Sequence, residues 1–160
     1  LCLVTQTTLS VSDTEEIALK LKERFPLILE QKSEDICYAT QNRQDAVKQL
    51  ALEADLIIVV GSENSSNSNR LRELAENCGV ESFLIDDPEK ISSLNLNNVN
   101  VMGITAGASA PEELVQQMVQ KCNLLGYKVN EEISGLKEEV YFKLPAELLL
   151  YKKLRSLVQV

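Results

Sequence analysis

Several features that define common protein classes are missing from this sequence of 160 residues. No apolar run approaches the roughly 20 residues of a membrane-spanning helix, so we expect no membrane segment. Glycine and proline are scarce, at six and four residues, and no low-complexity tract is present, which favours a compact fold over disorder. Histidine is absent and the net charge is −8, which disfavours a nucleic-acid or acidic-membrane surface.

The four cysteines, Cys2, Cys37, Cys78 and Cys122, form no Cys-x-x-Cys pair. Their spacing fits neither a secreted disulfide framework nor a self-contained zinc motif, and it favours a reducing compartment. We therefore expect the bacterial cytoplasm. A plastid stays the alternative, because a strand-like run starts at Leu1 and indicates a piece of a longer protein, whose N-terminus is absent. Cys2, Cys78 and Cys122 fall in a predicted strand or on apolar helical stripes, so we interpret them as small buried hydrophobes.

One pattern recurs along the chain: an apolar, β-rich run, a polar turn and then an amphipathic helix. The apolar runs span residues 1–5, 27–31, 55–60, 81–85 and 99–105. They are continuous rather than alternating, as expected for parallel strands that are covered on both faces. With right-handed crossovers, this pattern predicts an α/β fold with a mostly parallel sheet in three layers, αβα.

We divide the predicted fold into three parts. Residues 1–33 form a strand–helix–strand piece and residues 34–126 a fuller α/β domain. Residues 127–160 form a C-terminal tail, with two short strands and a final helix that begins at Pro145. The chain is therefore predicted to hold one full domain, part of a second and the tail.

Polar turns follow four of the predicted strands: TQTTLS (5–10), DICYATQNRQ (35–44), GSENSSNSNRL (61–71) and GITAGASAPE (103–112). Because the carboxyl ends of parallel strands share one edge of a sheet, these turns can converge on a ligand. In the third turn, seven of the eight residues 62–69 are serine or asparagine, and a helix follows directly. Such a segment suits an anion such as phosphate. The alternative is a polar loop with a helix cap, for which one serine or asparagine suffices.

The other three turns leave alternatives open. Ser109 stands three residues before a glutamate, which matches a capping box, although a capping hydroxyl can still face a ligand. Ser12 has the same spacing, which leaves Thr7 and Thr8 without a capping role. Cys37 precedes a helix, where the helix dipole favours a thiolate. One thiolate cannot hold a metal cluster, so the residues alone are compatible with a free cysteine or a metal ligand.

In this order, the four turns resemble the C-terminal half of the LytB/IspH family of hydroxymethylbutenyl diphosphate reductases. The motifs TQTTLS, DICYATQNRQ, VVGSENSSNSNRL and GITAGASAPE are each family-like, and their combination is highly specific. The resemblance covers residues 3–145 and includes the VYFKLP run near the end. It implies three similar α/β domains around a central cavity, of which this chain holds the end of the second and all of the third.

The resemblance also implies a reaction and a cofactor. Family members reduce 4-hydroxy-3-methylbut-2-enyl diphosphate (HMBPP) to isopentenyl and dimethylallyl diphosphate at a four-iron, four-sulfur cluster held by three cysteines, and a ferredoxin or flavodoxin supplies the electrons. The same resemblance implies that Cys37 is one of the cluster ligands. It implies that the diphosphate is bound by Ser65, Ser66, Asn67 and Ser109. It also implies that Thr7 lies near the substrate hydroxyl and helps proton delivery.

The departures from the family pattern limit what this chain can do alone. The family's other two cluster cysteines, its histidines and its acidic proton donor belong to the missing N-terminal half. We therefore predict that the chain alone is inactive, and that it exposes apolar interdomain surface that favours self-association. Two other classes stay open: a stand-alone phosphate-ligand binding module without redox chemistry, and a structural or assembly domain of a larger fused polypeptide.

Overall fold

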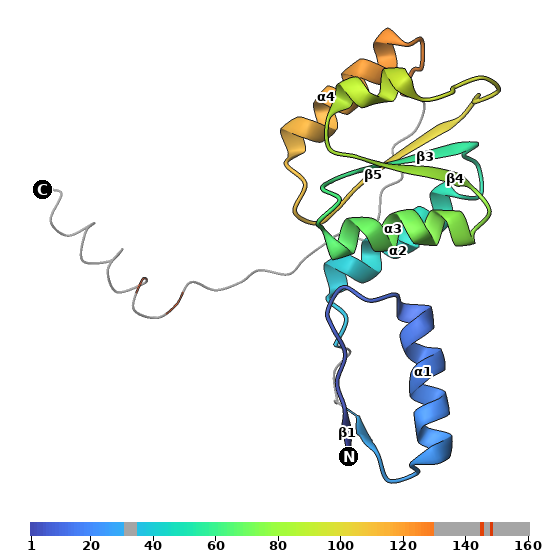
Figure 1. Ribbon diagram of the computed structural model, residues 1–160. Coiled ribbons are helices and arrows are strands. Elements are labelled where there is room, and N and C mark those ends of the chain that lie inside the picture. The colour runs from blue at the N-terminus through green and yellow to red at the C-terminus, as the bar shows by residue number, and fades with distance from the viewer. Residues whose placement is uncertain (31–34, 130–144, 146–147, 149–160) are drawn as a thin grey trace, which may run out of the picture.

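The computed structural model describes residues 1–30 and 35–129, together with Pro145 and Leu148 (Figure 1). Strands and helices alternate along these residues. The elements are β1 (Cys2–Leu3), α1 (Val11–Arg24), β2 (Leu29–Glu30), α2 (Tyr38–Leu50), β3 (Leu56–Val60), α3 (Ser66–Asn77), β4 (Glu81–Ile85), the 3-10 helix η1 (Pro88–Ser93), β5 (Met102–Ala106) and α4 (Glu112–Leu124). Each predicted strand run overlaps a strand, and the predicted α/β class is confirmed. The strands and helix predicted for the tail lie almost entirely outside the described residues.

The larger sheet has three parallel strands in the order β4-β3-β5. Leu56 of β3 aligns with Glu81 of β4 and with Met102 of β5, and the register continues to the end of each strand. All five residues of β3 are buried, which explains why this run is apolar at every position rather than at alternate ones. The sheet therefore has β3 at its centre.

Helices cover both faces of this sheet. Alternate side chains of β3 point to opposite faces. On one face, Leu56, Ile58 and Val60 belong to a core cluster with residues of η1 and α4. On the other, Ile57 and Val59 pack with residues of α2 and α3. Figure 1 shows these two layers on either side of the strands, and the predicted αβα arrangement is confirmed.

The first 30 residues form a second, smaller lobe. Strands β1 and β2 pair in parallel, with Cys2 opposite Leu29, and α1 connects them. We call residues 1–30 the N-terminal lobe and residues 35–129 the three-stranded unit. The boundary predicted after residue 33 lies within the undescribed stretch 31–34 and stays a prediction.

Two helix starts and two cysteines differ from the sequence prediction. The N-cap of α1 is Ser10, whose Oγ accepts from the Asp13 amide at 3.3 Å, rather than Ser12. The helix α4 begins after Pro111, so Ser109 does not cap it. Cys78 is exposed because it follows the last residue of α3 and leaves the apolar stripe, and Cys2 is exposed on a small sheet of only two strands with two residues each. Cys122 is buried as predicted.

None of the helices in the described part of the chain has the length and the apolar run that crossing a bilayer requires.

Candidate functional site

Hydrogen bonds join three of the four polar turns where α2 and α3 begin. The hydroxyls of Thr8 and Ser66 lie 3.1 Å apart, which joins the turn after β1 to the start of α3. The backbone N–H of Cys37 donates to the carbonyl of Thr7 at 3.1 Å, which joins the same turn to the start of α2. The structure therefore brings Thr7, Cys37 and the serine- and asparagine-rich turn together.

These two hydrogen bonds set an upper limit on the distance between the start of α2 and the start of α3. Thr7 and Thr8 are adjacent, so only one peptide unit and the Thr8 side chain separate the two bonds. With standard bond lengths, the Cys37 backbone nitrogen and the Ser66 hydroxyl are at most roughly 12 Å apart. A small ligand with two phosphate groups can span such a distance.

The start of α3 carries short polar side chains, and only one of them is needed to cap the helix. Ser65 is the N-cap, and its Oγ accepts from the Ser68 amide at 3.3 Å. One serine thus does what the helix-cap alternative requires. Asn67 and Ser68 remain, only 6% and 1% exposed. Neither the Asn67 amide group nor the Ser68 hydroxyl has a hydrogen-bond partner among the residues that the structure describes.

Unpartnered buried polar atoms are uncommon, and each costs about 1–3 kcal/mol if it stays unsatisfied. Here they lie at a helix N-terminus, where free backbone N–H groups and the helix dipole favour an anion. The start of α3 therefore has polar groups beyond what capping the helix requires, and their chemistry is compatible with an oxygen-rich, negatively charged ligand.

Two glycines allow the neighbouring turns to approach this point. A Cβ placed on Gly61 or on Gly107 would overlap the Ser68 hydroxyl, and one on Gly107 would also lie 3.8 Å from Nδ2 of Asn67. The turn after β5 thus packs directly against the start of α3. Ser109, two residues further on, is exposed, and its hydroxyl makes no hydrogen bond with the described residues. The structure brings its turn to the site but shows no contact of its side chain.

Cys37 has the surroundings of an exposed thiol rather than of a core residue. It is exposed, it is the N-cap of α2, and its side chain makes no capping hydrogen bond. By contrast, burial raises the pKa of the Cys122 thiol, and its sulfur lies 3.6 Å from that of Met102. Within the described ranges, no group of three or more histidine, cysteine or acidic residues could hold a metal ion. Cys37 is thus a single exposed thiol beside the polar turns.

Sequence reasoning missed two residues that hold the first turn in place. Thr8 had the same signal as Thr7, but only the structure shows its contact with Ser66. Gln44 lies at the end of the second motif and contacts the backbone at Leu9 and Val11. Its place within a polar motif was a signal, but nothing in the sequence indicated that its side chain turns inward.

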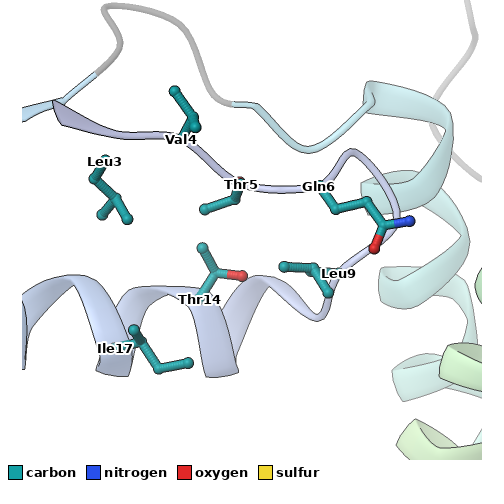
Figure 2. Close-up of a pocket in the computed structure, with 7 residues that line it drawn as sticks. All are labelled: Leu3, Val4, Thr5, Gln6, Leu9, Thr14 and Ile17. Atoms are coloured by element: carbon teal, nitrogen blue, oxygen red, sulfur yellow. The ribbon is translucent and has the colours of Figure 1, made fainter.

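A cavity of about 240 Å³ lies beside this site rather than in it. Figure 2 shows it between the first strand with its turn and α1. Its lining is mainly apolar and consists of Leu3, Val4, Thr5, Gln6, Leu9, Thr14 and Ile17. Such a lining does not suit a diphosphate, and we interpret the cavity as loose packing within the N-terminal lobe.

The fold and the site define a class of protein, namely an α/β protein whose polar turns gather at the starts of two helices beside one exposed thiol. The family model described as "LytB protein" matches residues 1–123, and the chain belongs to this family.

Curated relatives agree with the family assignment. The 4-hydroxy-3-methylbut-2-enyl diphosphate reductase of Alcanivorax borkumensis is 57% identical over 148 residues, which cover 92% of this chain and 48% of the relative. The reductase of the same name from Saccharophagus degradans is 55% identical over 145 residues, or 91% and 47% of the two chains. The chain thus spans about half the length of the curated relatives it matches.

A solved structure shows the same fold. The E-1-hydroxy-2-methyl-but-2-enyl-4-diphosphate reductase of Plasmodium falciparum superimposes with a TM-score of 0.79 at 35% identity, over 98% of this chain and 50% of that one. A second solved structure, described as the terminal enzyme of the non-mevalonate pathway, gives a TM-score of 0.53 at 28% identity over 77% of this chain.

Proposed function

We propose that this chain is the C-terminal half of a 4-hydroxy-3-methylbut-2-enyl diphosphate reductase, an enzyme that reduces HMBPP to isopentenyl and dimethylallyl diphosphate. The names of the relatives support this proposal. The observation that carries it is the pair of hydrogen bonds that links Cys37 through Thr7 and Thr8 to Ser66. They bring one exposed thiol close to the helix start that, in this proposal, binds the diphosphate.

In this proposal the start of α3 holds the diphosphate. Ser65, Ser66 and Asn67 offer hydroxyl, amide and backbone N–H groups, and Ser109 joins them from the turn after β5. Anchoring the diphosphate fixes where the other end of the substrate lies, and binding energy far from the reacting bond then assists the reaction. Thr7, next to Cys37, faces that other end and helps deliver a proton to the substrate hydroxyl.

The described residues do not fit a complete four-iron, four-sulfur cluster site. Cys37 would supply one thiolate, and no set of three metal-ligating residues lies within the described ranges. We infer that two further cysteines, the histidines that neutralise the diphosphate and an acidic proton donor come from the N-terminal half of the complete enzyme. When bound, the cluster supplies electron transfer and a Lewis-acidic iron. A ferredoxin or flavodoxin would reduce it in the bacterial cytoplasm.

The same reasoning gives two properties of the isolated chain. It has no reductase activity, because one thiolate is too few ligands to bind the cluster stably. It also self-associates, because the N-terminal lobe exposes large apolar side chains, among them Leu1, Leu19, Leu27 and Leu29. Analytical ultracentrifugation at several concentrations tests the second property, and a monomer at every concentration would contradict it.

Calorimetric titration with inorganic pyrophosphate tests the diphosphate site on this chain directly. We expect binding, and we expect Asn67→Ala to weaken it by about tenfold, the effect of one lost hydrogen bond to a charged group. Asn77→Ala, at the exposed far end of the same helix, is the matched control and should change nothing. Equal affinity in the Asn67 and Asn77 variants would contradict the proposal.

A stand-alone phosphate-binding module is the second candidate, favoured by the unpartnered Asn67 and Ser68 groups alone. The two candidates differ in what the complete gene encodes. The reductase predicts an upstream, Met-initiated segment with two cysteines and several histidines in the same reading frame. It also predicts that Cys37→Ser in the complete enzyme abolishes iron incorporation, whereas Cys78→Ser does not.

A further inference from the structure

Gln44 is a polar side chain at a buried position of α2, with 2% of its surface exposed. Both ends of its amide bind backbone. Nε2 donates to the carbonyl of Leu9 at 2.8 Å, and Oε1 accepts from the N–H of Val11 at 3.1 Å. Val11 is the first residue of α1, where the N–H groups have no partner within the helix. Gln44 thus satisfies both its own amide and the start of another helix.

The same backbone segment is held at two more positions. The N–H of Thr5 donates to the carboxylate of Asp35 at 2.7 Å, and the carbonyl of Thr7 accepts from the N–H of Cys37 at 3.1 Å. Residues 5, 7, 9 and 11 therefore all bind the segment 35–44 that carries the exposed cysteine. These bonds connect the N-terminal lobe to the three-stranded unit.

Thr8 lies between these alternate attachment points and contacts the other side. Its hydroxyl is 3.1 Å from that of Ser66, at the start of α3. The turn 5–11 is thus fixed between the cysteine-bearing end of α2 and the serine- and asparagine-rich end of α3. Gln44 makes two of the hydrogen bonds that hold this turn, and their backbone partners, Leu9 and Val11, both come after Thr8 in the sequence.

We propose that Gln44 is a positioning residue, which fixes the Thr7–Thr8 turn so that the thiol of Cys37 and the anion-binding start of α3 keep one relative geometry. This inference rests on the proposed function. Core packing alone does not require an amide here, because burying one is unfavourable unless both ends are hydrogen-bonded. The Gln44 amide instead makes its two hydrogen bonds to the backbone of the turn 5–11.

Gln44→Met in this chain tests the role, since methionine has a similar length but cannot make either hydrogen bond. Gln49→Met, at an exposed position of the same helix, is the matched control. We expect the Gln44 variant to weaken pyrophosphate binding in calorimetry by about tenfold. We also expect hydrogen exchange of the Val11 amide in NMR spectra to speed up by about tenfold, as for the loss of one or two hydrogen bonds. The control should change neither.

The outcomes separate a positioning role from a structural one. Faster Val11 exchange with unchanged pyrophosphate affinity would make Gln44 structural only and overturn the proposal, as would no change in either quantity. Circular dichroism confirms that the variants are folded. If Gln44→Met unfolds the chain, Gln44→Glu replaces it, because that variant keeps the acceptor for Val11 and loses the donor to Leu9.

Failure of the proposed function gives a different result. In that case the unsubstituted chain binds no pyrophosphate, and the inference is judged on the amide signals of Thr8 and Cys37. Gln44 hydrogen-bonds to neither residue among the bonds of the described residues. A shift of both signals in the spectrum of Gln44→Met, without a shift in the spectrum of Gln49→Met, therefore supports positioning. Unmoved signals overturn it.

Discussion

The N-terminal lobe and the three-stranded unit are built from the same strand–helix pattern, yet they differ in how well they bury it. Ile57 of β3 is fully buried between two strands and beneath helices, whereas Ile17 of α1 is 57% exposed. A central strand with neighbours on both sides has two covered faces, and a pair of two-residue strands has too little surface to cover one helix. The number of strands, rather than the pattern, decides how much apolar surface leaves water.

The candidate site joins these unequal regions. Ser66 and Asn67 stand on the well-packed unit, but Thr7 and Thr8 belong to the lobe with exposed apolar side chains. The geometry of the site therefore depends on the hydrogen bonds between the regions, at Thr8–Ser66 and at Cys37–Thr7, as much as on the core of either one.

Paired isoleucine truncations should show the largest contrast between the regions. Ile57→Ala removes a fully buried side chain and should lower the free energy of unfolding by about 3–4 kcal/mol, from lost burial and the cavity left behind. Ile17→Ala, at a half-exposed position, should cost less than about 1 kcal/mol. Urea denaturation followed by circular dichroism measures both. Equal losses would mean that the N-terminal lobe is as well packed as the sheet.

A single methyl group should have the next largest effect, within the three-stranded unit and beside the candidate site. In Gly107→Ala the new Cβ overlaps the Ser68 hydroxyl, which should cost about 1–3 kcal/mol of unfolding free energy in the same assay. Adding Ser68→Ala removes the hydroxyl and should restore most of the loss. A double variant as unstable as Gly107→Ala would show that the strain arises elsewhere.

The sequence predicted the regions unequally, for a physical reason. The residues 56–60 of the predicted strand 55–60 are all apolar, as expected for a parallel strand that is buried on both faces, and the prediction for β3 was confirmed. The pattern of α1, by contrast, correctly predicted a helix but not its exposure. An apolar stripe shows which face of a helix seeks burial, and it does not show whether enough chain is present to cover it.

Helix starts were the least predictable feature of the site. Ser10 and Ser12 both precede acidic residues, and their side chains lie 3.1 Å apart, so spacing alone could not choose the cap. At Ser109, the spacing matched a capping box, but the turn closed by the Ala110 N–H on the Gly107 carbonyl delays the start of α4. The roles of Cys37, Ser65, Ser66, Asn67, Ser109 and Thr7 stay predictions, and the proposed experiments test those of Cys37 and Asn67.

The smallest of the three expected changes in unfolding free energy should appear at acidic pH, from Asp55 of the three-stranded unit. The Asp55 carboxylate accepts from the Val101 N–H at 2.9 Å and from the Asn100 N–H at 2.8 Å, and these bonds hold its pKa below the usual value of 3.8. They tie the start of β3 to the loop before β5. The N-terminal lobe contributes nothing to this contact, so its effect belongs to the better-packed region.

The sign follows from the direction of the shift. Because the folded chain binds the proton of Asp55 less tightly than the unfolded chain, the carboxylate contributes stability that is fully present well above pH 3.8 and is lost as the pH falls through the lowered pKa. Asp55→Asn should therefore reduce the free energy of unfolding at pH 7 by a small fraction of the Ile57→Ala effect, and should make its decline between about pH 5 and pH 3 shallower. Urea denaturation of the Asp55→Asn variant and of the unsubstituted chain across this range measures the difference in slope. If the Asp55 variant loses stability in parallel with the unsubstituted chain down to pH 3, the two backbone bonds do not hold the loop in solution, and the sheet is less firmly closed at β5 than its buried core indicates.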